Sequence, residues 1–118
     1  MTLGRAEEAL RWLDQAATLD QRYADTHPLA RYDLACDLAL GVPLVGQAGG
    51  GRDIAAEAQR RERADRAMEA LRRAIAQGYT FPAIISRDAD LDPVRPRSDF
   101  RLLMMDLAMP ADPFAAAR

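Results

Sequence analysis

One spacing of small and large apolar residues occurs twice in this chain. Residues 9–16 and residues 67–74 both place alanine, leucine and alanine at their first, fifth and eighth positions, and an Arg-Ala pair begins four residues before each segment. Positions three and four residues apart share one face of an α-helix, so each segment predicts a face on which a second helix packs closely. The repeated spacing therefore predicts an all-α fold built from stacked helices.

Length and composition favour one small helical domain. A chain of 118 residues is long enough for one hydrophobic core, and its apolar and charged fractions are those of an ordinary globular protein. No apolar segment reaches the roughly 18 residues that span a bilayer, and the chain does not start with the pattern of a secretory signal. We therefore expect a cytoplasmic chain with no membrane partner. Cys36 is the only cysteine, so no internal disulfide can form.

Helix start and stop signals predict five helices. The first carries a wide apolar face that includes Trp12. Thr26 is predicted to cap the second helix, with Pro28 in its first turn, and Asp53 is predicted to cap the third, which Gly78 ends. The predicted helices span about 3–20, 27–40, 53–77 and 80–87, and the last begins at 98 and ends before residue 110.

Two segments are predicted to lack regular structure. Residues 42–52 are rich in glycine and have the composition of a flexible surface loop, with residues 45–52 expected to be the most mobile internal segment. Residues 111–118 are expected to form a frayed tail. Residues 1–110 are accordingly predicted to form a single domain.

The order of these segments resembles the tetratricopeptide repeat family. Residues 4–20 resemble the second helix of such a repeat, residues 32–36 resemble the first helix of the next, and residues 67–74 match its second helix. The two matching blocks lie 58 residues apart, whereas a standard repeat has about 34, so roughly 24 residues are inserted, largely in the glycine-rich segment. Residues 88–100 are similar to the closing segment of tetratricopeptide-like regions in large bacterial serine/threonine protein kinases and related signalling proteins.

The resemblance implies an antiparallel helix-turn-helix stack of tetratricopeptide type with a short C-terminal helical cap. It also implies a non-enzymatic module that binds a protein or peptide partner, as the terminal repeat segment of a larger signalling or scaffold protein. The alternative is a self-contained small helical protein that forms a homodimer through its C-terminal helix.

Two apolar surfaces are candidate partner-binding sites. The second helix is apolar on two sides, so four of its residues face either a binding groove or the neighbouring first helix: Leu29, Tyr32, Cys36 and Ala39. In the last helix, one stripe is predicted to be buried, and it consists of Phe100, Leu103, Met104 and Leu107. A second apolar stripe on the opposite side, formed by Leu102, Met105 and Met109, is predicted to bind a partner or a second copy, unless the tail folds back over it.

Catalytic, cofactor and metal sites find little support. Lysine is absent, which excludes Schiff-base and phosphate-loop lysines. Residues 46–53 space two glycines as a phosphate-binding loop does, but Arg52 and Asp53 replace the lysine and the hydroxyl residue. Residues 88–92 have the aspartate spacing of a calcium loop, but Pro93 replaces the essential glycine, so these aspartates are predicted to cap turns and pair with nearby arginines. With one histidine and one cysteine, we predict no metal site, no cofactor and no enzymatic activity.

Nucleic acid is also not an expected partner. Six arginines crowd residues 60–73, but at 100° per residue they spread around the helix, and acidic residues lie among them. Glu69 and Arg73 have the favourable i to i+4 order of a helical ion pair. A formal net charge of −2 further opposes attraction to a polyanion.

Overall fold

The computed structural model describes residues 2–47 and 53–109, and this part of the chain is helical without any strand. It contains five α-helices and two short 3-10 helices, whose bounds agree with the predicted helices to within a few residues. The elements are α1 (Thr2–Tyr23), α2 (Pro28–Gly41), η1 (Val42–Leu44), α3 (Ile54–Ala76), α4 (Pro82–Arg87), η3 (Ala89–Leu91) and α5 (Ser98–Ala108).

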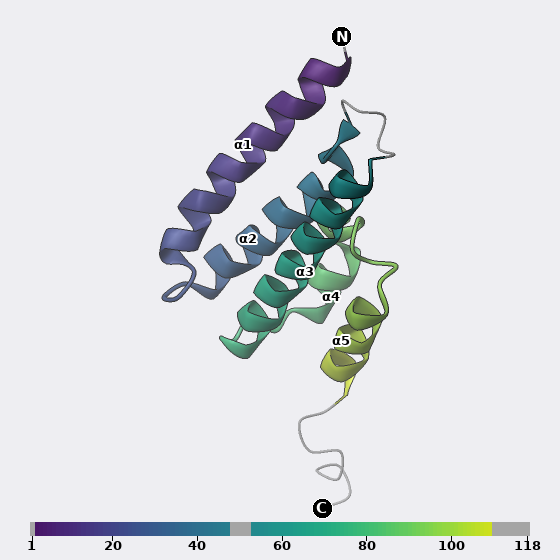
Figure 1. Ribbon diagram of the computed structural model, residues 1–118. Helices are drawn as coiled ribbons and strands as arrows, with labels where there is room; N and C mark the ends of the chain where they lie inside the picture. The colour runs from purple at the N-terminus through teal and green to yellow at the C-terminus, as the bar shows by residue number, and fades with distance from the viewer. Residues whose placement is uncertain (1, 48–52, 110–118) are drawn as a thin grey trace, which may run out of the picture.

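Helix α2 is the centre of the fold. Consecutive helices α1, α2 and α3 run antiparallel, with α2 between the other two (Figure 1). Helix α2 packs most extensively on α3 and on α1, and η3 also packs on α2. The C-terminal helices α4 and α5 lie beyond α3, at the opposite side of the molecule from α1.

Local signals set most of the helix ends. The Asp53 side chain accepts a hydrogen bond from the backbone N–H of Ala55 at 3.1 Å, as predicted for an N-cap. Gly78 has φ of 112°, a left-handed conformation that favours glycine, and it ends α3 as predicted. The predicted cap at Thr26 is wrong: α1 extends to Tyr23, so the Thr26 hydroxyl bonds to the end of α1, and His27 takes the N-cap position.

Small residues let α2 and α3 approach closely. Ala35 and Ala39 of α2 are fully buried, as are Leu71 and Ala74 of α3, and the core continues into the C-terminal elements. Its largest fully buried side chains are Met68, Leu71, Ile85, Leu91 and Val94. The predicted packing face of residues 67–74 is therefore confirmed.

The start of the glycine-rich segment is a packed turn. Residues 42–44 form η1, Val45 is buried, and its carbonyl accepts a hydrogen bond from Arg60 Nη1 at 2.8 Å. Gly46 has φ of 74° and lies against Ala56, where an added Cβ would collide with that alanine. The prediction that this segment lacks regular structure is therefore wrong for residues 42–44, whereas its mobility stays a prediction. The predictions for residues 48–52 and for the tail at 111–118 concern residues outside the described part of the chain.

Candidate interaction surfaces

Helix α5 has two apolar sides, of which one is buried. Phe100 is buried in the core, and Leu103, Met104 and Leu107 pack against it, so the predicted inner stripe is confirmed. The opposite stripe is exposed to solvent: 60% of Leu102, 63% of Met105 and 60% of Met109 are accessible. These three residues are called the α5 face below.

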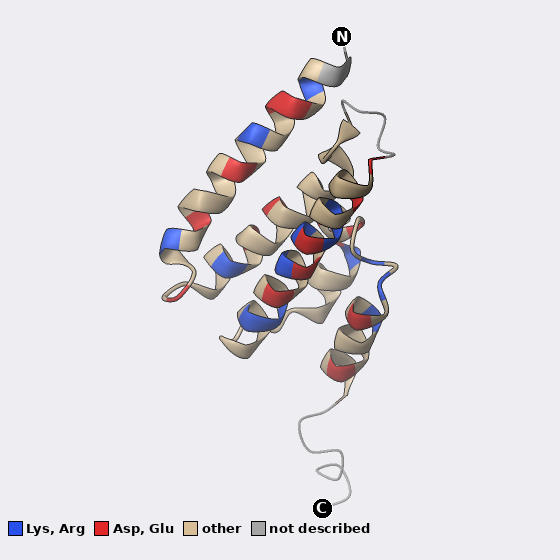
Figure 2. Cartoon of the chain, in the orientation of Figure 1, with Lys and Arg blue, Asp and Glu red and all other residues tan. Residues whose placement is uncertain are grey.

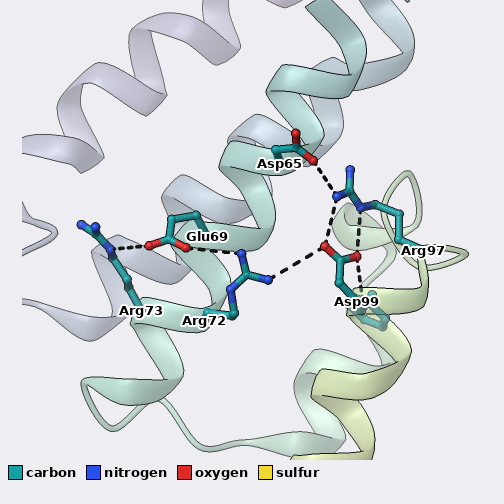
Figure 3. Close-up of polar contacts among 7 residues, drawn as sticks. Asp65, Glu69, Arg72, Arg73, Arg97 and Asp99 are labelled. Carbon is teal, nitrogen blue, oxygen red and sulfur yellow. Dashed lines mark hydrogen bonds and ion pairs between the residues drawn. The ribbon is translucent and has the colours of Figure 1, made fainter. Parts of the chain in front are cut away.

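Ion pairs fix α5 against α3. Arg97, just before α5, donates to Asp65 of α3 at 2.6 Å and to Asp99 of α5 at 3.0 Å (Figure 3). Arg72 of α3 lies 3.9 Å from the same Asp99. The hydrogen bond from Arg97 is the main cause of a lowered pKa at Asp99, so this carboxylate is ionised at neutral pH. The network orients the α5 face away from α3.

Acidic neighbours accompany the arginines of α3. Bands of acidic and basic residues alternate along this helix (Figure 2). Glu69 accepts from Arg73 at 2.8 Å, which confirms the predicted i to i+4 pair, and from Arg72 at 3.3 Å. The pKa of Glu69 is lowered because both arginines donate to it. Because Arg72 and Arg73 both pair with Glu69, these two arginines do not form a stripe of unpaired positive charge.

The predicted binding surface on α2 is largely wrong. Only 4% of Tyr32, 6% of Cys36 and 0% of Ala39 are accessible, so these residues belong to the core. Tyr32 donates a hydrogen bond to Asp88 Oδ2 at 2.6 Å, and its ring stacks on Tyr79 with the centroids 4.3 Å apart. The segment around η3 thus fills the side of α2 that the sequence left open. Leu29, the fourth predicted residue, is exposed.

The aspartates of residues 88–92 stabilise turns, as predicted. The Asp88 side chain accepts from the backbone N–H of Asp90 at 3.0 Å, and Asp92 accepts from Arg95 at 3.0 Å. Cys36, Asp88 and Asp90 offer ligand atoms within 4.8 Å of one another, a geometry that metal ions use. Burial, and then the Asp88 charge, raise the pKa of the Cys36 thiol far above its usual range. Cys36 is therefore a neutral thiol. The carboxylate of Asp88 beside it already accepts hydrogen bonds from the Tyr32 hydroxyl and from the backbone N–H of Asp90.

A groove lies between α1 and α3, and α2 forms its floor. It has a volume of about 580 Å³ and a floor that includes Leu34 and Leu38. Arg63 of α3 crosses it and binds Asp14 of α1 at 2.6 Å. The same guanidinium donates from Nε to the Leu38 carbonyl at 2.8 Å, and it is almost completely buried. This role of Arg63 was not predictable from helical periodicity, because its partners lie on two other helices.

Helix α1 exposes an apolar stripe that includes Trp12, which the sequence predicts to lie on the packing face of this helix. Trp12, Leu19 and Tyr23 follow helical spacing on one side of α1, and 65%, 53% and 52% of them are accessible. The stripe ends at a hollow of about 350 Å³, whose lining includes Tyr23, Leu29, Asp20 and Asp33. The signal for it was the width of the predicted apolar face, which exceeds what one neighbouring helix can cover.

Comparisons with protein-family models, with curated proteins and with solved structures give no match for this chain. Among the described residues, no helix is both long enough and apolar enough to cross a bilayer.

Proposed function

We propose that this chain is a non-enzymatic protein–protein interaction module, the terminal repeat segment of a larger signalling or scaffold protein, with its helices in a stack of tetratricopeptide type. The antiparallel order of α1, α2 and α3 supports the repeat interpretation (Figure 1). The α5 face is the observation on which the proposal of an interaction rests most directly.

Folding alone does not explain the α5 face. The inner stripe of α5 already packs on the core through Phe100, and the ion pairs of Arg97 hold the helix in place. Leu102, Met105 and Met109 are not among the side chains packed on this core, and each is at least 60% accessible. Neighbouring large apolar side chains on an otherwise polar surface mark contact sites for proteins.

A homodimer through α5 is the second candidate function, and the same face favours it. Leu102 and Met105 lie one turn apart on α5, and Met109 follows directly after the helix, so two antiparallel copies of α5 can pack these side chains around a two-fold axis. This arrangement requires no other protein. It predicts self-association of the purified chain.

Sedimentation analysis of the purified chain over a wide concentration range separates the two functions. A dimer that the double variant L102D/M105D dissociates, with an unchanged helical circular dichroism signal, supports the homodimer. The control is Ile54→Asp, which places a single aspartate on an exposed apolar residue at the start of α3.

If the purified chain is a monomer, a second measurement tests the interaction module. A photoreactive residue at position 105 is introduced in cells, and the cross-linked protein is identified, purified and titrated with the chain. Binding that L102D/M105D weakens at least tenfold supports the interaction module. A chain that neither self-associates nor cross-links through this face refutes both candidates.

A further inference from the structure

The repeated segment is fully buried in α3 and only partly buried in α1. In residues 67–74, Ala67, Leu71 and Ala74 are at most 1% accessible, and α2 is the main neighbour of this helix. In residues 9–16, the matching side chains are only partly buried. The position that Ala70 fills in α3, with 5% accessible, is occupied in α1 by Trp12, with 65% accessible.

The geometry of α2 explains the difference. It covers α1 along the side that contains the buried Ala6 and Ala17. On an α-helix, Ala6 and Ala17 lie about 120° to 140° around the axis from Trp12. The side with Trp12 therefore faces away from α2, and no described element of the chain covers it (Figure 1). This surface, formed by Trp12, Leu19, Tyr23 and Leu29, is called the α1 face below.

Carboxyl groups cluster beside the α1 face. Asp20 and Asp33 line the same hollow as Tyr23 and Leu29. Burial raises the pKa of Asp33, and the charge of Asp20 raises it further. Asp37 lies next to them on α2, and its Oδ2 atom is buried without a hydrogen-bond partner in the described structure. Of the charged groups that act on Asp37, only Arg63 is a cation, and it already donates to Asp14.

The chain contains one example of a helix that covers such a face. On the side of α2 that packs against α3, Arg31 is 5% accessible and donates to Gln77 at 3.0 Å. With the 58-residue spacing of the repeat, Gln77 corresponds to Leu19, and the next residue corresponds to Asp20. An arginine at the same place in a helix on the α1 face would lie beside the Asp20 carboxylate.

We propose that the α1 face binds an amphipathic helix of a protein partner, and that this helix carries an arginine or lysine within its apolar side. The apolar side covers Trp12, Leu19 and Tyr23, and the cation pairs with Asp20 and Asp33. Charge favours this occupant over a second copy, because a symmetric dimer through the α1 face would bring the two acidic centres together. The proposal deepens the proposed function, on which it rests.

A displayed library of 16-residue helical peptides provides the probe. Alanine and leucine form their apolar side, and the positions within and beside it are randomised. Trp12 is the only tryptophan of the chain, so binding at the α1 face shifts its emission to shorter wavelength. Selected peptides are expected to be enriched in arginine and lysine, and replacing the selected basic residue with glutamate is expected to weaken binding at least tenfold. Selection without basic residues, or binding without a shift in Trp12 emission, overturns the proposal.

Variants of the chain locate the site and separate its parts. Leu19→Glu is expected to abolish binding, and the double variant D20N/D33N is expected to remove the preference for the basic peptide over its glutamate form. Both sites are accessible at the surface, and circular dichroism checks the fold of each variant. The matched control Leu102→Glu, on the α5 face, is expected to leave peptide binding unchanged.

Two results distinguish this proposal from the proposed function. If D20N/D33N binds both peptides as the wild type does, the basic occupant is refuted, while an interaction through the α5 face stands. If the wild-type chain self-associates and Leu19→Glu prevents it, a second copy occupies the α1 face and the proposal fails.

Discussion

Gly41 and Arg63 provide a test of how the three central helices are held together. Gly41 ends α2 with φ of −77°, a conformation that any residue adopts, so a side chain there causes no backbone strain. An added Cβ would instead overlap with Nε, Cζ and Nη2 of Arg63. The glycine therefore leaves room for a buried guanidinium, and Gly41→Ala must displace it.

The magnitude follows from the hydrogen bonds of Arg63. Its guanidinium donates to the Leu38 carbonyl at 2.8 Å and to the Asp37 carbonyl at 3.0 Å, and it pairs with Asp14 at 2.6 Å. A hydrogen bond of a charged group contributes about 1.5 to 3 kcal/mol, and Asp14 is too exposed to contribute much more. Replacing glycine with alanine in a helix gains about 1 kcal/mol. Losing both carbonyl bonds therefore leaves G41A destabilised by at least about 2 kcal/mol.

A double-mutant cycle isolates the cause. Urea unfolding is measured for the wild type, G41A, R63A and G41A/R63A. In the R63A background no guanidinium occupies the space, so G41A is expected to stabilise the protein by about 0.5 to 1 kcal/mol. The effect of one substitution thus changes sign. A stabilising effect of G41A in the wild-type background would refute the reasoning, because Arg63 would then have moved without loss.

Three further predictions concern single side chains. Asp53→Ala is expected to destabilise the protein by about 1 kcal/mol, because the hydrogen bond to Ala55 caps α3, and thermal unfolding measures the loss. Tyr32→Phe is expected to cost about 2 kcal/mol through the lost bond to Asp88, whereas equal urea midpoints would show that this bond adds nothing. Burial, with Asp20 and Asp33 nearby, raises the pKa of Asp37 from 3.8 to about 8 against the opposing charge of Arg63. The folded state therefore holds a proton that the unfolded state releases, and this group's contribution to stability is lost between about pH 4 and pH 8, by at most about 1.4 kcal/mol per pH unit. Asp37→Asn is expected to flatten that slope in urea titrations at pH 5, 7 and 9, and a slope equal to that of the wild type would contradict the assignment.

The helices were predictable because their signals are local. Asp53 caps α3 through a neighbour two residues away, and Gly78 ends it through its own backbone conformation. Apolar spacing within one helix was enough to identify the inner stripe of α5. The ion pair of Arg97 with Asp65 was not predictable in this way, because Asp65 lies 32 residues away in the sequence. Such a pair depends on how two helices are placed, and helical periodicity does not determine this.

The α2 residues show where sequence periodicity stops being informative. Tyr32, Cys36 and Ala39 are apolar or small whether they face a groove or a core, so their pattern was compatible with both. The hydroxyl of Tyr32 donates a hydrogen bond to Asp88, which lies 56 residues away in the sequence. A polar partner on a distant turn thus turned a candidate binding surface into interior.

The repeated motif shows the same limit from the opposite side. Residues 9–16 and 67–74 carry one spacing, yet the matching residues of the first set are only partly buried and those of the second are fully buried. The spacing predicts that a second helix packs on these residues, but it does not predict which chain supplies that helix. In α3 the neighbour is α2 of the same chain. On α1 the exposed apolar residues Trp12, Leu19 and Tyr23 lie beside this spacing without a described neighbour, and the carboxylates of Asp20 and Asp33 near them favour a partner that carries positive charge.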